Sequence, residues 1–99
     1  MPILSFVSAR ISPERRDAVS RPYTEMVGRG LPPAIRETFL LVGEDDSMAI
    51  ATVWNSRADL DAMLASGEEP FARRVLREAG GESDARFFEI ASEGRSDSR

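Results

Sequence analysis

The sequence predicts a single α+β domain in which helices pack on one sheet as a two-layer sandwich. Three observations indicate this class. A chain of 99 residues has room for one core, strand-like and helix-like segments alternate along it, and Gly or Pro stands at most of the junctions. The domain is expected to span residues 1–92. Residues 93–99 are polar and patternless, and we expect a disordered tail there.

The first quarter of the chain predicts a strand followed by a helix. Residues 3–11 are rich in β-branched and aromatic side chains, which favours a strand. The Ser-Pro-Glu run at residues 12–14 is typical of a helix start, because each of the three residue types suits a helix N-terminus. Apolar residues then recur at helical spacing. Pro22 falls inside this pattern and is expected to kink or split the helix.

The middle of the chain predicts a β-hairpin. Residues 35–42 and 48–54 are two apolar runs of strand length. The polar segment 43–47 between them is of hairpin length and rich in acidic residues. We therefore expect the two strands to pair antiparallel.

The last third predicts two short helical segments and a final strand. Ser56 with Asp59 three residues later is a variant of the capping box, and Gly67 ends the helix that it begins. Pro70 starts a second helical segment. Residues 86–91 are expected to form the fourth strand.

The resulting order is β-α-β-β-α-β, with two helical pieces in the second α position. This order is typical of a ferredoxin-like sandwich, with the helices on one face of an antiparallel sheet. The other face would then be wet, yet apolar side chains fall on both parities of the strands, as Ile3 and Val7 do against Leu4 and Phe6. Something must cover the second face, and the simplest candidate is an identical sheet in a two-fold homodimer.

Composition excludes several classes of function. The net charge is −4 and acids alternate with bases, which argues against a nucleic-acid partner. All 13 basic residues are Arg, so no lysine can form a Schiff base. The chain contains neither Cys nor His, and it therefore lacks the commonest thiolate and imidazole ligands and the commonest general base. We expect no metal site and no His-ligated haem.

No membrane or secretion signal is apparent. No run approaches the roughly 18 apolar residues of a membrane span, and the N-terminus enters a strand-like run without a basic region before it. We expect a cytoplasmic protein that does not bind membranes.

The segment 52–66 resembles a stretch found in antibiotic-biosynthesis-monooxygenase (ABM) domains, which are of the dimeric α/β-barrel type. There a Trp ends the third strand, and a short polar cap and an amphipathic helix follow. Residues 33–39 are similar to the family's entry into its second strand, and the acidic turn 44–46 lies in the expected hairpin. The resemblance covers residues 3–92. It implies a homodimer whose two sheets form a barrel, with a pocket between sheet and helices in each copy.

The resemblance also implies a choice of chemistries. Some members of the family oxidise polycyclic aromatic phenols with O₂ and no cofactor, whereas others degrade haem. The haem-degrading members carry an Asn on the first strand, the Trp, and a His on the following helix. Here Trp54 matches, but Met63 stands near the His position and residues 6–8 contain no Asn. We therefore expect no cofactor, and either a cofactor-independent monooxygenase of a phenol- or hydroquinone-type substrate or a non-catalytic binding or structural domain of the same fold.

Three residues are candidates for catalysis, each with a structural alternative. Trp54 either walls the cavity of an aromatic ligand or seals the strand–helix junction as a core residue. Tyr23 could relay a proton, or it packs on the apolar side of its helix. Arg36 could face inward and stabilise an anion, or it lies at the sheet rim.

The set of candidate ligand-binding residues overlaps with these. Asn55 could orient a ligand or belong to the helix cap, and the basic run at residues 73–74 is interpreted as a solvent-facing side of the last helix. The set comprises Trp54, Asn55, Thr38, Met63 and Phe6.

Overall fold

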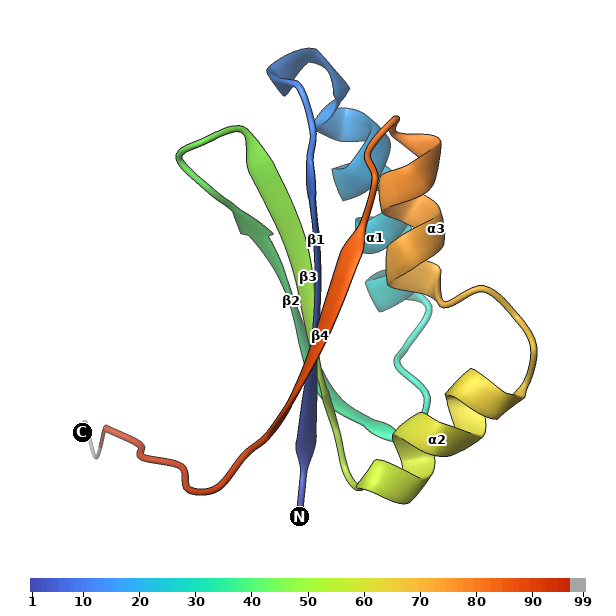
Figure 1. Ribbon diagram of the computed structural model, residues 1–99, viewed down its shortest axis with the longest axis vertical. Coiled ribbons are helices and arrows are strands. Elements are labelled where there is room, and N and C mark those ends of the chain that lie inside the picture. The colour runs from blue at the N-terminus through green and yellow to red at the C-terminus, as the bar shows by residue number, and fades with distance from the viewer. Residues whose placement is uncertain (97–99) are drawn as a thin grey trace.

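Three helices lie against one face of a four-stranded antiparallel sheet in this computed structural model, which describes residues 1–96 (Figure 1). The strand order is β2-β3-β1-β4, so the first and third strands are central. This arrangement confirms the predicted α+β class and the order β-α-β-β-α-α-β. The elements are β1 (Ile3–Arg10), a 3₁₀ turn η1 (Pro13–Arg15), α1 (Asp17–Gly28), β2 (Ile35–Val42), β3 (Ser47–Trp54), α2 (Arg57–Ala65), α3 (Phe71–Glu78) and β4 (Asp84–Glu89).

The start of the first helix differs from the prediction. Residues 13–15 form a 3₁₀ turn, and the hydroxyl of Ser12 makes no capping hydrogen bond. The α-helix begins at Asp17 and continues without interruption through Pro22 to Gly28. Pro22 removes only the donor that would bond to the carbonyl of Ala18. Because Ala18 is exposed, water can satisfy that carbonyl, and the helix is not split.

The hairpin and the capped helix are confirmed. Strands β2 and β3 pair antiparallel around the turn, where Asp46 has a positive φ of 60°. The backbone amide of Asp59 donates to the hydroxyl of Ser56 at 3.2 Å, which caps α2 as the spacing predicted. Gly67 follows the helix with a φ of +81°, a conformation that glycine adopts without strain.

The last strand begins two residues earlier than expected. It pairs with β1 from Asp84, opposite Ser8, to Glu89, opposite Ile3. Charged residues at both ends obscured these bounds in the sequence. Residues 93–96 carry no regular secondary structure, and the rest of the predicted tail, residues 97–99, lies outside the described residues.

The core between sheet and helices consists of two clusters of buried apolar residues. One joins the upper part of the sheet to α1 and α3, through residues such as Val19 and Leu76. The other joins the opposite end of the sheet to α2, through Ile3, Trp54 and Leu60. Among the described residues, none of the helices has the length and apolarity that a membrane crossing requires.

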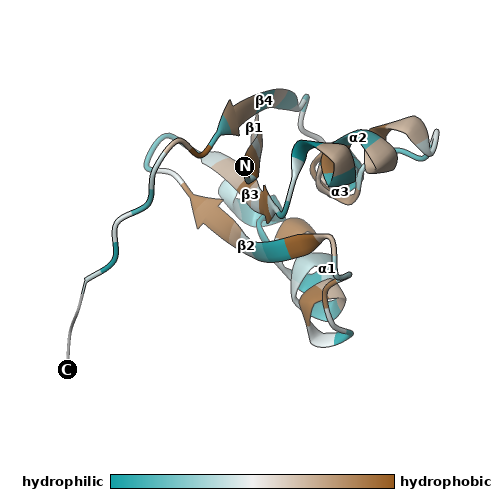
Figure 2. Cartoon of the chain, turned by 90° about the horizontal axis from the view of Figure 1, so that it is seen from below, coloured by the Kyte–Doolittle hydropathy of each residue, from teal (hydrophilic) through white to brown (hydrophobic). Residues whose placement is uncertain are grey.

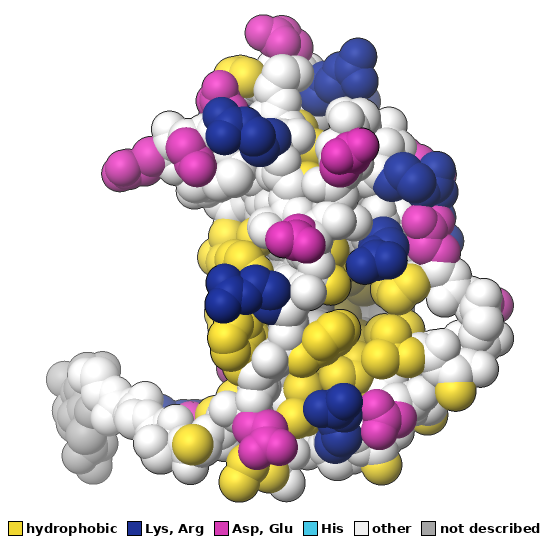
Figure 3. Space-filling model, viewed as in Figure 1, with side chains coloured by type: hydrophobic (Ala, Val, Ile, Leu, Met, Phe, Trp, Pro, Cys, Tyr) yellow, Lys and Arg dark blue, Asp and Glu magenta, His cyan; other side chains and the backbone are white. Residues whose placement is uncertain are grey.

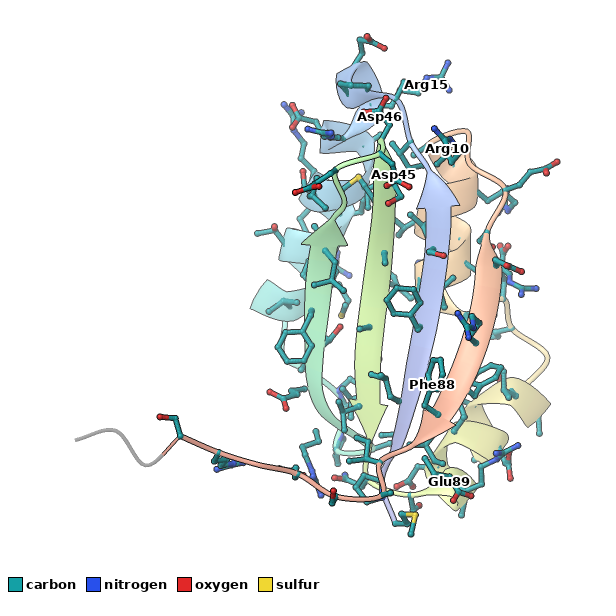
Figure 4. All side chains as sticks on the ribbon, turned by 60° about the vertical axis from the view of Figure 1, so that its left-hand side comes forward. Arg10, Arg15, Asp45, Asp46, Phe88 and Glu89 are labelled. Atoms are coloured by element: carbon teal, nitrogen blue, oxygen red, sulfur yellow. The ribbon has the colours of Figure 1, made fainter. Side chains whose placement is uncertain are left out.

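The face of the sheet that points away from the helices is apolar and uncovered. Viewed along the strands, all the helices lie on one side of the sheet (Figure 2), and Figure 4 looks toward the other side, with Phe88 among its side chains. Phe39, Leu41 and Phe88 are exposed by 45, 42 and 42 %. By strand alternation and register, the middle of this open face comprises Leu4, Phe6, Ser8, Phe39, Leu41, Ala49, Ala51, Val53, Arg86 and Phe88, and Arg10, Glu37, Ser47 and Asp84 lie toward the ends of its strands.

Candidate functional site

A cavity of about 620 Å³ lies between the sheet and the helices. Its floor comes from the strands, where Ser5, Ile50 and Thr52 face inward, and its walls include Leu60 of α2 and Phe71 of α3. Figure 3 shows apolar side chains gathered around a hollow on this side of the molecule. The volume falls in the range of small-molecule binding sites, about 300–1,000 Å³.

Trp54 fulfils both of the roles considered for it. It is only 7 % exposed and packs with Ile3 and Leu60 at the junction of β3 and α2, and it also lines the cavity. Its indole Nε1 donates a hydrogen bond to the Ser5 hydroxyl at 3.0 Å. The indole donor is therefore already engaged, and what Trp54 offers a ligand is its aromatic surface.

A short chain of hydroxyl groups connects α1 to the cavity floor. Tyr23 donates to Thr38 Oγ1 at 3.4 Å, and Thr38 Oγ1 lies 3.3 Å from Thr52 Oγ1. Thr38 in turn donates to the carbonyl of Ala51 at 3.2 Å. Thr38 and Thr52 line the cavity and Tyr23 does not. Tyr23 therefore reaches a ligand only through Thr38.

The structure brings Trp54, Thr38 and Met63 together at the cavity, and it places the other four candidates, Tyr23, Arg36, Asn55 and Phe6, outside its lining. Arg36 sits at a bulge of β2, is exposed, and pairs with Glu93 at 3.2 Å, as expected of a residue at the sheet rim. Asn55 is exposed and donates to the carbonyl of Pro33 at 2.7 Å, so it connects the end of β3 to the loop that precedes β2.

Phe6 was expected at the cavity but lies on the open face of the sheet. Side chains alternate along a strand, so Phe6 points opposite to Ser5 and Val7, which do line the cavity. Its neighbours across β3 and β4 are Ala51 and Arg86. The sequence could not indicate which parity of this strand faced the helices, because both parities are apolar.

Sequence reasoning missed Arg73, which borders the cavity from α3. It was assigned to a solvated helix face, and its side chain is indeed exposed. It is also the only charged side chain among the described residues that line the cavity. A signal for this was present, since Arg73 precedes the fully buried Leu76 by three residues and therefore flanks the buried side of the helix.

An ion pair holds the segment that joins α2 to α3 beside the cavity. Arg77 donates to the two carboxylate oxygens of Glu69 at 2.7 and 2.9 Å. These hydrogen bonds, more than any other interaction, lower the pKa of Glu69, and the nearby charges of Arg77, Arg74 and Arg73 act in the same direction. Within residues 1–96, no three His, Cys, Asp or Glu side chains are grouped so that they could hold a metal ion.

Comparison with known proteins gives structural likeness without close sequence relatives. No protein-family model matches the chain, and no curated protein does. A solved structure of a protein of unknown function from Nitrosomonas europaea superposes with a TM-score of 0.71 at 12 % identity, covering 98 % of this chain and 96 % of that one.

Two further matches carry descriptions of activity. SnoaB, a cofactor-independent oxygenase from Streptomyces nogalater, matches with a TM-score of 0.66 at 14 % identity over 93 % of this chain and 95 % of its own. A structure of an antibiotic biosynthesis monooxygenase matches with a TM-score of 0.64 at 20 % identity over 91 % of this chain and 99 % of that one. In its sheet, its helices and their order, the chain therefore has the fold of the antibiotic biosynthesis monooxygenase structures.

Proposed function

We propose that this protein is a cofactor-independent monooxygenase that oxidises a small phenol- or hydroquinone-type molecule inside the cavity. The observation that carries the proposal is the apolar cavity of about 620 Å³ with Trp54 on its wall. Its size and lining suit an aromatic ligand of a few rings. The shared fold with SnoaB, itself a cofactor-independent oxygenase, supports the same chemistry.

The reaction balances with O₂ as its only co-substrate. When a phenol becomes a quinone, one atom of O₂ forms the new carbonyl group. The other oxygen atom leaves as water with two hydrogens, one from the phenol O–H and one from the ring C–H. The substrate loses four electrons and O₂ accepts four, so no external reductant is consumed. The anion of the substrate is the species that donates the first electron to O₂.

The protein contributes positioning and the exclusion of water. The ring system stacks against Trp54, and the hydroxyl groups of Thr38 and Thr52 offer hydrogen bonds to a substrate oxygen on the cavity floor. Holding the substrate anion and O₂ together in a dry site converts a bimolecular encounter into an intramolecular one. This role requires no side chain that titrates near neutral pH.

A second candidate function is non-catalytic binding of a small apolar molecule. The observation that favours it is that the described cavity lining contains no carboxylate, and that Tyr23 reaches the cavity only through Thr38. A protein of this kind would bind the same ligands and leave them unchanged.

We further propose that the protein acts as a homodimer in which the open faces of two copies pack together. The support is the uncovered apolar surface that Phe39, Leu41 and Phe88 present on the open face. Side chains of this kind gathered on one sheet face are typical of an interaction surface. A two-fold contact between identical sheets would cover all of them at once.

Oxygen uptake tests the proposed activity. A panel of anthrones and hydroquinones is added to the purified protein, and O₂ consumption and product are followed together. We expect one O₂ per oxygenated product molecule and no accumulation of hydrogen peroxide, which two-electron oxidation of a hydroquinone to its quinone would release. Protein-dependent binding without any uptake across the panel would favour the non-catalytic alternative.

A matched pair of variants locates the activity. Ala72 is half-buried on α3 and lines the cavity, whereas Ala62 is exposed on α2 and does not. Ala72→Trp should fill the cavity and abolish uptake, while Ala62→Trp should keep it. Uptake that survives Ala72→Trp in a folded protein would show that the reaction does not take place in this cavity.

A further inference from the structure

The described lining of the cavity carries positive charge and no negative charge. Its floor and walls consist of apolar side chains and a few hydroxyl groups, and the only formal charge among the described lining residues is the guanidinium of Arg73. No Asp or Glu faces the cavity in the part of the chain that the structure describes. In a chain of net charge −4, this single positive charge is opposite in sign to the average of the protein.

The guanidinium of Arg73 is available to a ligand. Within residues 1–96 it takes part in no ion pair, side-chain hydrogen bond or cation–π contact, whereas the other two arginines of α3 each have a partner. Arg77 is engaged with Glu69 at 2.7 and 2.9 Å, and Arg74 lies over the ring of Phe71 at 5.5 Å. The charge of Arg73 contributes to the lowered pKa of Glu69, but both carboxylate oxygens of Glu69 already accept hydrogen bonds from Arg77.

A positive charge at an apolar cavity discriminates between ligands by charge. An anionic group beside Arg73 gains charge-assisted hydrogen bonds that strengthen as water is excluded. An ammonium group at the same place would be repelled, and it would find no carboxylate on the lining to pair with. A neutral ligand gains only the burial of its apolar surface.

We infer that the cavity takes an amphipathic anion, with an apolar ring system against Trp54 and one carboxylate, sulfonate or phenolate group facing Arg73. The inference rests on the proposed use of the cavity as a ligand site and not on oxidation. It also deepens the proposed function, because the lining holds no side chain that could deprotonate a phenol. A substrate that enters as an anion needs no such base.

Two dyes that differ by one sulfonate group provide the test. They are 8-anilinonaphthalene-1-sulfonate and its neutral parent N-phenyl-1-naphthylamine, and both fluoresce on entering an apolar site. Dissociation constants are measured for the wild-type chain, for Arg73→Gln and Arg73→Lys, and for Arg74→Gln as the matched control one residue further along α3. The cavity-filling variant Ala72→Trp should abolish binding of both dyes.

We expect Arg73→Gln to raise the dissociation constant of the sulfonate dye about tenfold, the effect of losing one charge-assisted contact. The dissociation constant of the neutral dye should change less than about twofold. Arg73→Lys should restore most of the sulfonate affinity, and Arg74→Gln should change neither dye. Raising the salt concentration should weaken binding of the sulfonate dye only.

Three results would overturn the inference. One is an equal loss of affinity for both dyes in Arg73→Gln. Another is a loss of affinity for the sulfonate dye in Arg74→Gln that equals the loss in Arg73→Gln. The third is binding of the sulfonate dye that persists in Ala72→Trp. If both dyes bind in the cavity with no dependence on Arg73, the inference fails while the proposed use of the cavity stands. If neither dye binds to the wild-type chain, both fail together.

Discussion

Replacing Phe39 with arginine should separate the two copies that we propose to pack through the open face. Phe39 lies on β2, opposite Ala51 of β3, with its side chain on the open face. It remains 45 % exposed in the single chain. A partner sheet would cover the exposed part of the ring, and an arginine there would place a charge in an apolar contact.

The size of the effect follows from the exposed fraction. Complete burial of a Phe side chain contributes about 1.5–3 kcal/mol, and with 45 % of its surface still exposed Phe39 can gain about 1 kcal/mol from a partner. The two-fold axis repeats the contact, which gives about 2 kcal/mol per dimer, or a factor of about 30 in the dissociation constant. Burying the guanidinium adds a desolvation cost. We therefore expect the dissociation constant to rise by about 100-fold or more.

Sedimentation velocity over a dilution series measures this constant directly. Val42→Arg is the matched control, because Val42 is a 56 % exposed apolar residue on the same strand that pairs with Met48 on the helix side of the sheet. The control should dimerise like the wild-type chain. The reasoning would be refuted by a wild-type chain that stays monomeric at micromolar concentration, or by equal effects of the two substitutions.

Three further predictions concern the folded chain itself. Ser5→Ala leaves the buried indole N–H of Trp54 without its acceptor and should destabilise the protein by about 1–2 kcal/mol in urea unfolding; a cost below about 0.5 kcal/mol would show that the 3.0 Å hydrogen bond contributes little. Pro22→Ala should stabilise α1 by about 1–3 kcal/mol, since proline is the least favourable residue inside a helix, and an unchanged midpoint in the same assay would contradict this. Because hydrogen bonds from Arg77 lower the pKa of Glu69, the ion pair stabilises the fold above the ordinary carboxyl pKa, and this contribution disappears as the pH falls through the lowered value. The melting temperature of Glu69→Gln should therefore lie slightly below that of the wild-type chain near pH 7 and converge with it in acid; a difference that persists below about pH 3 would point to another cause.

The fold could be predicted from the sequence because its signals are local. Strand-like runs, the Ser56–Asp59 cap and the glycine after α2 each act over a few residues, and the structure confirms them. The exceptions are also local in origin. Proline in a helix is usually disruptive, but the carbonyl that loses its donor at Pro22 belongs to the exposed residue Ala18, where water can replace the missing donor.

The candidate site was harder to predict because it depends on which side of each strand meets the helices. Trp54 ends a mostly apolar strand beside a helix cap, and both roles considered for it are compatible with that position. Phe6 could not be assigned, because its strand is apolar on both parities. Arg73 was missed for a different reason, since an arginine on an amphipathic helix is usually solvated, and only the packing of α3 shows that it flanks a cavity.

The two faces of the sheet are physically linked, and this connects the proposed dimer to the proposed site. Along β3, Thr52 and Trp54 face the cavity, while Ala51 and Val53, which alternate with them, face the other way. Backbone that carries the cavity floor therefore also carries the open face, and any displacement of one moves the other. Covering the open face with a second sheet would hold this backbone in place and keep the hydroxyl groups of Thr38 and Thr52 at their 3.3 Å separation. A variant that separates the copies, such as Phe39→Arg, should consequently weaken ligand binding in a cavity that it does not touch.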